Sequence, residues 1–236
     1  MAADYLERGA VAGVAGGLVY GLFVATVGNA FTKGLETFEH GHGGGGPVVS
    51  ELTTTVASIG GGVLWGLLFG VAVFGMAYFF LEPAIPGSGA TKRLALAAAG
   101  FMTVSGTPWL VLPPQPPGVE QALGTETRLV WYAGLMALGA VVAVLAGLAY
   151  RRTKNRHTAV TLGAMALPLA LLAVPVAVAP ANPVHGDVPA TLVAAYRWTV
   201  VFGQLLLWAT IAGVHAWLGD VRTPSTADLD YTATAD

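Results

Sequence analysis

The sequence has no cysteine and few charged residues. Only 10% of its 236 residues are charged, whereas a soluble domain usually carries about 25%. Without cysteine there is no disulfide, thiolate metal site or cysteine nucleophile. The formal net charge of −2 gives no reason to expect nucleic acid or another strongly charged partner. A chain that is 55% hydrophobic would expose more apolar surface than water tolerates, unless lipid covers it.

The motifs of nucleotide hydrolysis and of common hydrolases are also missing. The sequence contains no phosphate-binding P-loop, no Gly-x-Ser-x-Gly and no His-Glu-x-x-His. We therefore expect neither ATP hydrolysis nor enzymatic activity. The first apolar block is too long for a cleavable signal peptide and lacks a clear cleavage site, so we interpret it as a retained helix.

Long apolar blocks dominate what is present. A helix needs about 20 residues to cross roughly 30 Å of hydrocarbon. Six blocks qualify, at 9–31, 56–81, 94–112, 129–150, 159–179 and 193–218. The sequence thus predicts an all-α integral membrane protein, a bundle of about six transmembrane helices. We expect one transmembrane domain over 1–219 and a short, acidic, disordered tail over 220–236.

The distribution of Lys and Arg predicts the orientation. With six spans both termini lie on one side of the membrane, and that side collects most of the basic residues. They are Arg8, Lys92, Arg93, Arg151, Arg152, Lys154, Arg156 and Arg222, against Lys33, Arg128 and Arg197 on the other side. By the positive-inside rule, both termini should be cytoplasmic and the loops around 32–55, 113–127 and 180–192 should face outward.

Glycine and proline suggest how the helices pack. Gly9, Gly13, Gly17 and Gly21 form a four-residue stripe in the first span, and a matching stripe of Gly62, Gly66 and Gly70 lies in the second. Because small residues let helix backbones approach closely in lipid, the two stripes should face each other, as tight static packing or as a moving gate. Prolines inside the third and fifth spans, at 108, 168 and 175, should kink them.

Three polar residues in the last span share one helical face. Arg197, Gln204 and His215 are separated by near-whole turns, and Trp208 lies on the same stripe. Polar groups at membrane depth usually face the bundle or water. The stripe is therefore either a polar track for an ion, or Arg197 snorkels to the interface while the other two bond neighbouring helices.

The outer loops carry side chains that could bind a metal. In the first loop a helix continuing past the membrane would place two carboxylates and an imidazole on one face, ahead of four glycines. The third loop adds a histidine and an aspartate. The candidate ligands are Glu36, Glu39, His40, His42, His185 and Asp187. Carboxylate with imidazole suits borderline divalent ions such as Co²⁺, Ni²⁺ or Zn²⁺; the alternative is a solvated loop with histidines by chance.

A proline-rich segment carries a family resemblance. The run Pro-Pro-Gln-Pro-Pro-Gly-Val occupies 113–119, and Arg128 opens the next helix, where it could pair with Glu120 or Glu126. The motif residues are Pro113, Pro114, Pro116, Pro117, Gly118 and Arg128. Together with Tyr196-Arg197 and Gln204 to Trp208 near the end, this pattern resembles the CbtA family of cobalt transporter subunits. One departure is Leu112, where an aromatic lead into the motif is expected.

The resemblance implies cobalt uptake for cobalamin synthesis, across the plasma membrane, with a small single-helix CbtB-like partner. We expect a permease subunit for a divalent transition metal, Co²⁺ first and Ni²⁺ or Zn²⁺ as alternatives, that captures the ion at its extracytoplasmic loops. The rival hypothesis is a non-transporting scaffold subunit of a larger membrane complex. The oligomeric state stays open, a homo-oligomer included.

Overall fold

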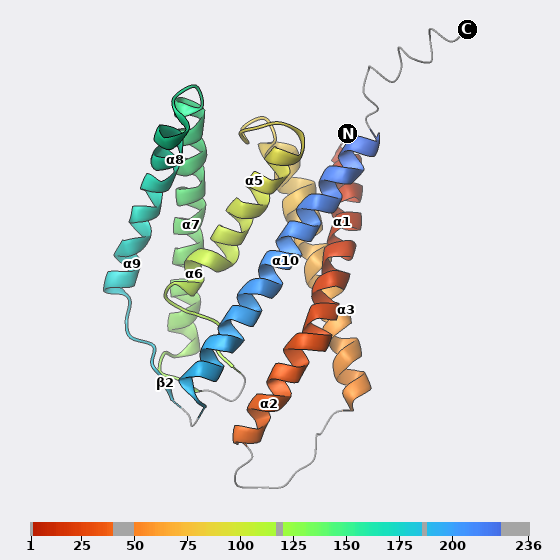
Figure 1. Cartoon of the computed structure of the whole chain (residues 1–236), viewed down its shortest axis with the longest axis vertical. Helices are drawn as coiled ribbons and strands as arrows, with labels where there is room; N and C mark the ends of the chain where they lie inside the picture. Colours follow the sequence, from red (N-terminus) through yellow and green to blue (C-terminus); the bar gives the residue numbers. More distant parts are fainter. Residues whose placement is uncertain (1, 40–49, 117–119, 186–187, 223–236) are drawn as a thin grey trace, which may run out of the picture.

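Six helical segments lie side by side in the described part of the chain (Figure 1). The computed structural model describes residues 2–39, 50–116, 120–185 and 188–222. The first segment joins α1 (Ala2–Phe23), the π-helical turn η1 (Val24–Gly28) and α2 (Asn29–Glu39), and the second joins α3 (Glu51–Phe69), π-helical η2 (Gly70–Ala77) and α4 (Tyr78–Leu81). The third joins α5 (Gly89–Phe101), π-helical η3 (Met102–Gly106) and α6 (Thr107–Trp109).

The second half contains two long helices and a broken one. The fourth segment is α7 (Thr125–Thr153) and the sixth is α10 (Ala190–Arg222). The fifth comprises α8 (Thr158–Ala166), the 3₁₀ segment η4 (Leu167–Leu172) and α9 (Ala173–Val178). Pro168 lies in the first turn of η4, where its missing donor and ring disfavour a regular α-helix. The break predicted there is confirmed.

Five of the six segments are long and apolar enough to span a membrane, by length and composition: Ala2–Gly34, Glu51–Leu81, Thr125–Thr153, Thr158–Val178 and Ala190–Val221. The third segment is more polar, since it begins with Lys92 and Arg93 and contains Thr103, Ser105 and Thr107. Its helix ends at Trp109 rather than at the predicted residue 112, because the proline-rich run that follows cannot continue a helix. The predicted all-α membrane bundle is confirmed.

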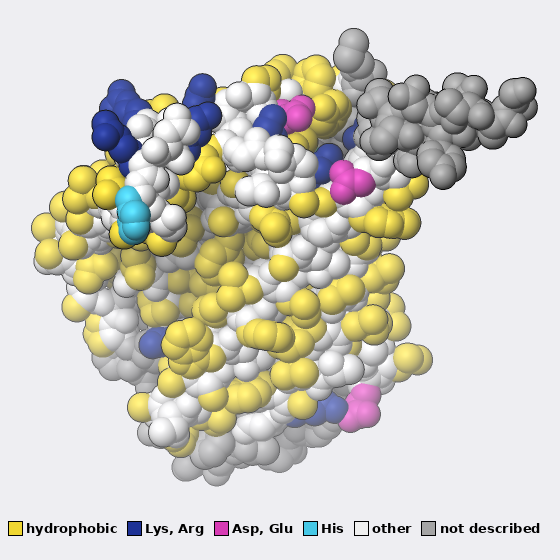
Figure 2. Space-filling model, turned by 45° about the horizontal axis from the view of Figure 1, so that its top comes forward, with side chains coloured by type: hydrophobic (Ala, Val, Ile, Leu, Met, Phe, Trp, Pro, Cys, Tyr) yellow, Lys and Arg dark blue, Asp and Glu magenta, His cyan; other side chains and the backbone are white. Residues whose placement is uncertain are grey.

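The two ends of the bundle differ. α1 begins and α10 ends at the same end, which we call the terminal end (Figure 1). At the opposite end β1 (Glu120–Gln121) and β2 (Val184–His185) form a two-stranded antiparallel ribbon, and we call this the ribbon end. Lys and Arg side chains gather at the terminal end, and hydrophobic side chains cover much of the face between the two ends (Figure 2). This distribution fits a molecule surrounded by lipid.

The glycine stripes face each other, as predicted. A Cβ atom added at Gly62 would lie 2.6 Å from the carbonyl oxygen of Gly17, and the Gly13 and Gly66 backbones also meet. The same close approach joins Gly9 to Gly70. Only glycine permits this distance, so α1 and α3 pack backbone to backbone.

The core lies where α1, η2, α4, α5 and α10 meet. Phe74, Tyr78, Leu207, Trp208 and Ile211 are its large buried side chains. α10 is the most buried of the five candidate spans. In its most apolar 18-residue stretch 39% of the residues are buried, compared with 11% in the segment α8–η4–α9. The α8–η4–α9 segment is therefore a peripheral arm that packs on α7.

Candidate functional site

Arg197 joins the last helix to the proline-rich loop at the ribbon end. Its Nε donates a hydrogen bond to the carbonyl oxygen of Pro114 (3.2 Å), and its Nη2 donates to Oε1 of Gln115 (3.0 Å). The side chain is partly buried. These two bonds hold the loop against α10, and the two sequence-based interpretations of Arg197, a polar track and snorkelling to the outer interface, stay predictions.

A small cavity of about 280 Å³ lies at this junction. Its walls are Trp109, Pro113, Pro114, Ala194, Arg197, Trp198 and Val201. The rigid proline backbone supplies one wall and the first turns of α10 supply the other. Arg197 is the charged side chain in the lining, so the cavity by itself is not suited to a cation.

The β1–β2 ribbon links the second and third ribbon-end loops. Glu120 lies directly opposite His185 in the register, and Gln121 lies opposite Val184. Asn182 fastens the two loops, since its Oδ1 accepts from the Leu123 amide (3.1 Å) and its Nδ2 donates to Gln121 Oε1 (3.2 Å). The backbone thus brings a carboxylate residue to the same place as the candidate ligand His185. Sequence reasoning missed this pairing, because nothing local predicts which loops will meet.

The inner face of α10 carries buried polar atoms that lack partners. Gln204 Oε1, Trp208 Nε1 and both ring nitrogens of His215 have no hydrogen-bond partner in the described part of the chain. Thr107 Oγ1, on the neighbouring third segment, is buried and unpartnered in the same way. Since over 90% of buried polar groups in proteins are satisfied, a row of such atoms along one helix needs an explanation.

His215 is the most enclosed member of the row. Its exposed fraction is 0%, and its ring lies 5.7 Å from that of Phe74 and 5.3 Å from that of Tyr78, centroid to centroid. The guanidinium of Arg93 lies over the Tyr78 ring, with Cζ 5.8 Å from the ring centroid. Both sequence-based interpretations of Gln204 and His215, a polar track and bonds to neighbouring helices, stay predictions.

Between His215 and the terminal end of the bundle, charged residues form two groups of contacts. Tyr5 Oη donates to Glu82 Oε2 (2.8 Å), and Lys92 Nζ lies 3.5 Å from Glu82 Oε1. Arg93 Nη1 lies 3.8 Å from Asp220 Oδ1. One group links α1, the loop after α4 and α5, and the other links α5 to α10. Sequence reasoning did not single out these contacts, whose members come from four separate segments.

The side chains of the six predicted metal ligands are not described by the structure. His40, His42 and Asp187 are outside the described residues, and Glu36, Glu39 and His185 are described only in backbone, within α2 and β2. The helix continues past the predicted end of the first span, with α2 reaching Glu39, which is the condition under which Glu36 and Glu39 share one face. Within the described residues there is no group of three or more His, Asp or Glu side chains that could hold a metal ion.

The motif residues are partly described. Pro113, Pro114 and Pro116 lie in a stretch without helix or strand, and Pro117 and Gly118 fall outside the described residues. Arg128 Nη2 donates to Thr125 Oγ1 (3.2 Å) within the first turn of α7. Its predicted pairing with a loop carboxylate stays a prediction.

Comparison with known families identifies the class. A family model described as "Probable cobalt transporter subunit (CbtA)" matches residues 2–220 of this membrane-spanning bundle. The chain therefore belongs to the CbtA family. This is a family of transporter subunits and not of enzymes, so the chain is a multi-pass transporter subunit of the plasma membrane. No curated protein and no solved structure matches the chain.

Proposed function

We propose that this chain forms the path by which Co²⁺ crosses the membrane, with capture at the ribbon end and passage along the inner face of α10. Membership of a cobalt transporter subunit family supports the substrate. The observation that carries the route is His215, a fully buried imidazole in a membrane-spanning helix whose ring nitrogens form no well-aligned hydrogen bond with the described residues, although the Phe74 backbone is close enough to interact with the ring. Ionisable groups at such depth usually serve transport, and imidazole is a good ligand for Co²⁺, Ni²⁺ and Zn²⁺.

The capture site in this proposal uses the first and third loops at the ribbon end. Glu36 and Glu39 are one turn apart in α2, ahead of His40 and His42, and a helix brings residues at this spacing to one face. In the other loop region, His185 lies opposite Glu120 in the ribbon, and Asp187 follows. Carboxylate and imidazole donors would then come from two parts of the same end of the molecule.

The ribbon end faces outward in this proposal. The basic residues at the terminal end, four of them around the α7–α8 turn (Arg151, Arg152, Lys154 and Arg156), favour a cytoplasmic location for that end. The family's description as a subunit supports a partner, which we propose is a small single-helix CbtB-like protein. No energy source is evident in the sequence, so the driving force would come from the partner, the membrane potential or an ion gradient.

Radioactive cobalt uptake tests the capture site. Cells that carry the chain and its partner should accumulate cobalt, and alanine at His40, His42 and His185 together should lower uptake at limiting cobalt. His157→Ala is the matched control, since His157 caps α8 at the opposite end of the bundle, where its Nδ1 accepts from the Ala159 amide. Uptake that is indifferent to the triple substitution would contradict capture by these histidines. Competition by Ni²⁺ and Zn²⁺ would rank the metals.

A scaffold role is the second candidate, and the glycine contact favours it. α1 and α3 meet at the backbone along most of their length, which is typical of a static membrane framework. In that case the partner alone would carry cobalt and substitutions inside this chain would affect only assembly. Uptake that persists when this chain is deleted but its partner is present would favour the scaffold.

A further inference from the structure

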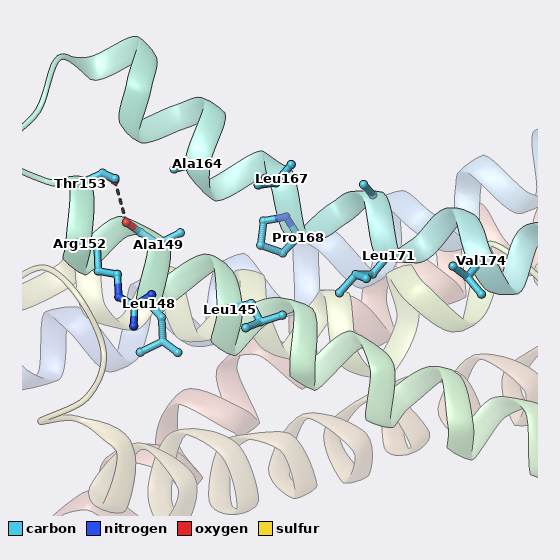
Figure 3. Close-up of a pocket in the computed structure, with 11 residues that line it drawn as sticks. Leu145, Leu148, Ala149, Arg152, Thr153, Ala164, Leu167, Pro168, Leu171 and Val174 are labelled. Carbon is cyan, nitrogen blue, oxygen red and sulfur yellow. Dashed lines mark hydrogen bonds between the residues drawn. The ribbon is translucent and has the colours of Figure 1, made fainter.

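A groove of about 670 Å³ lies between α7 and the peripheral α8–η4–α9 arm (Figure 3). Leu145 and Leu148 of α7 form one wall, and Leu167, Pro168 and Leu171 of η4 form the other. All of these are apolar. The groove is separate from α10 and takes no part in the proposed cobalt route.

The groove exists because the arm is held mainly near its start. Thr161 Oγ1 donates to the carbonyl oxygen of Thr153 (2.7 Å), which fixes α8 to the end of α7. Further along, small side chains face the gap, Ala149 from α7 and Ala164 from α8, and the 3₁₀ turn at Pro168 redirects the arm. Side chains this small leave room for an acyl chain, and the surrounding medium at this depth is lipid.

One charged group borders the groove. Arg152 lines it at the terminal end, and among the described side chains no carboxylate lies within 4.0 Å of its guanidinium. Thr153, the other polar residue there, already donates its hydroxyl to the Ala149 carbonyl oxygen (2.7 Å; dashed line in Figure 3). Arg151, Lys154 and Arg156 lie close by in the chain. A guanidinium without a partner, in a positive neighbourhood, is complementary to a phosphate.

We propose that this groove binds an anionic phospholipid, with one acyl chain between α7 and the α8–η4–α9 arm and the phosphate on Arg152. Charge complementarity argues for this occupant, because the apolar gap ends at Arg152, whose guanidinium has no carboxylate partner among the described side chains. A flexible acyl chain fits an elongated apolar gap of this kind, and the phosphate would anchor the arm to α7.

Lipid binding by the purified full-length chain in neutral detergent tests this. Native mass spectrometry and thermal unfolding should show that phosphatidylglycerol binds and stabilises the chain more than phosphatidylcholine with the same acyl chains. Arg152→Gln should weaken phosphatidylglycerol binding about tenfold, as expected for the loss of one charged hydrogen-bonding pair. Arg156→Gln is the matched control and should leave binding nearly unchanged. Ala164→Phe, which fills the groove without altering charge, should lower binding of both lipids.

Three results would overturn the proposal. Equal binding of the two lipids would contradict an anionic occupant, because both carry a phosphate and only their net charge differs. Equal weakening by Arg152→Gln and Arg156→Gln would indicate a diffuse basic surface instead of a site. A photo-crosslinking residue at position 171 that captures a protein in native membranes, with no lipid adduct, would assign the groove to a partner subunit.

Discussion

Single glycines decide how closely the first two spans approach. A Cβ at Gly62 would lie 2.6 Å from both Gly17 O and Gly21 Cα, whereas a Cβ at Gly60, on the same helix, would meet nothing within 4 Å. The two glycines therefore form a matched pair on α3, because Gly62 faces α1 and Gly60 faces open space.

We expect Gly62→Ala to destabilise the fold and Gly60→Ala to leave it unchanged or slightly stabilised. The cost at Gly62 should be about 1–3 kcal/mol, since the extra methyl group forces two backbones apart. At Gly60, alanine gains up to about 1 kcal/mol of helix propensity. Thermal unfolding in detergent measures both variants, and equal midpoints would contradict the packing of α1 on α3.

Arg197 acts at the residue scale on the proline-rich loop. We expect Arg197→Gln to cost about 1.5–3 kcal/mol, the usual value for hydrogen bonds made by a charged group, and to speed hydrogen exchange in the segment 110–116. Thr199→Val is the control, because Thr199 Oγ1 donates only to the Ala195 carbonyl oxygen one turn earlier. If exchange in the loop is the same in both variants, Arg197 does not hold it.

At the scale of whole elements, hydrophobic length was enough to predict the helices. The blocks around residues 129–150 and 193–218 became α7 and α10, because only a helix satisfies its backbone within lipid. Glycine spacing was also sufficient to predict that the first two spans face each other. The end of the third span was placed too late, since the apolar residues Leu110 to Leu112 continue the block after the helix has ended.

Contacts between distant segments could not be predicted in this way. The ribbon consists of two residues in each strand, too few for any periodic signal, so the pairing of Glu120 with His185 had no signature. Arg197 was placed on a polar face by its spacing, but its acceptors, Pro114 and Gln115, come from a loop far away in sequence. The unpartnered atoms of Gln204 and His215 likewise depend on what each neighbouring helix presents.

At the scale of the whole molecule, orientation is the first expectation to check. A reporter at residue 154, in the basic turn between α7 and α8, should lie in the cytoplasm, and one at residue 45 should lie outside. The physical reason is the excess of Lys and Arg at the terminal end. Accessibility labelling in intact cells distinguishes the sides. The reverse labelling pattern would place the candidate capture loops in the cytoplasm.

The measurement that tests the central claim most directly is cobalt uptake by variants of the α10 inner face. His215→Phe and Gln204→Leu remove the polar atoms and keep a similar shape with a slightly larger side chain, and both should fold, reach the membrane and assemble. If Co²⁺ passes along this face, uptake should fall at least about tenfold, which corresponds to roughly 1.4 kcal/mol in the limiting barrier, while His157→Ala transports normally. Normal uptake by both inner-face variants would contradict the proposed route.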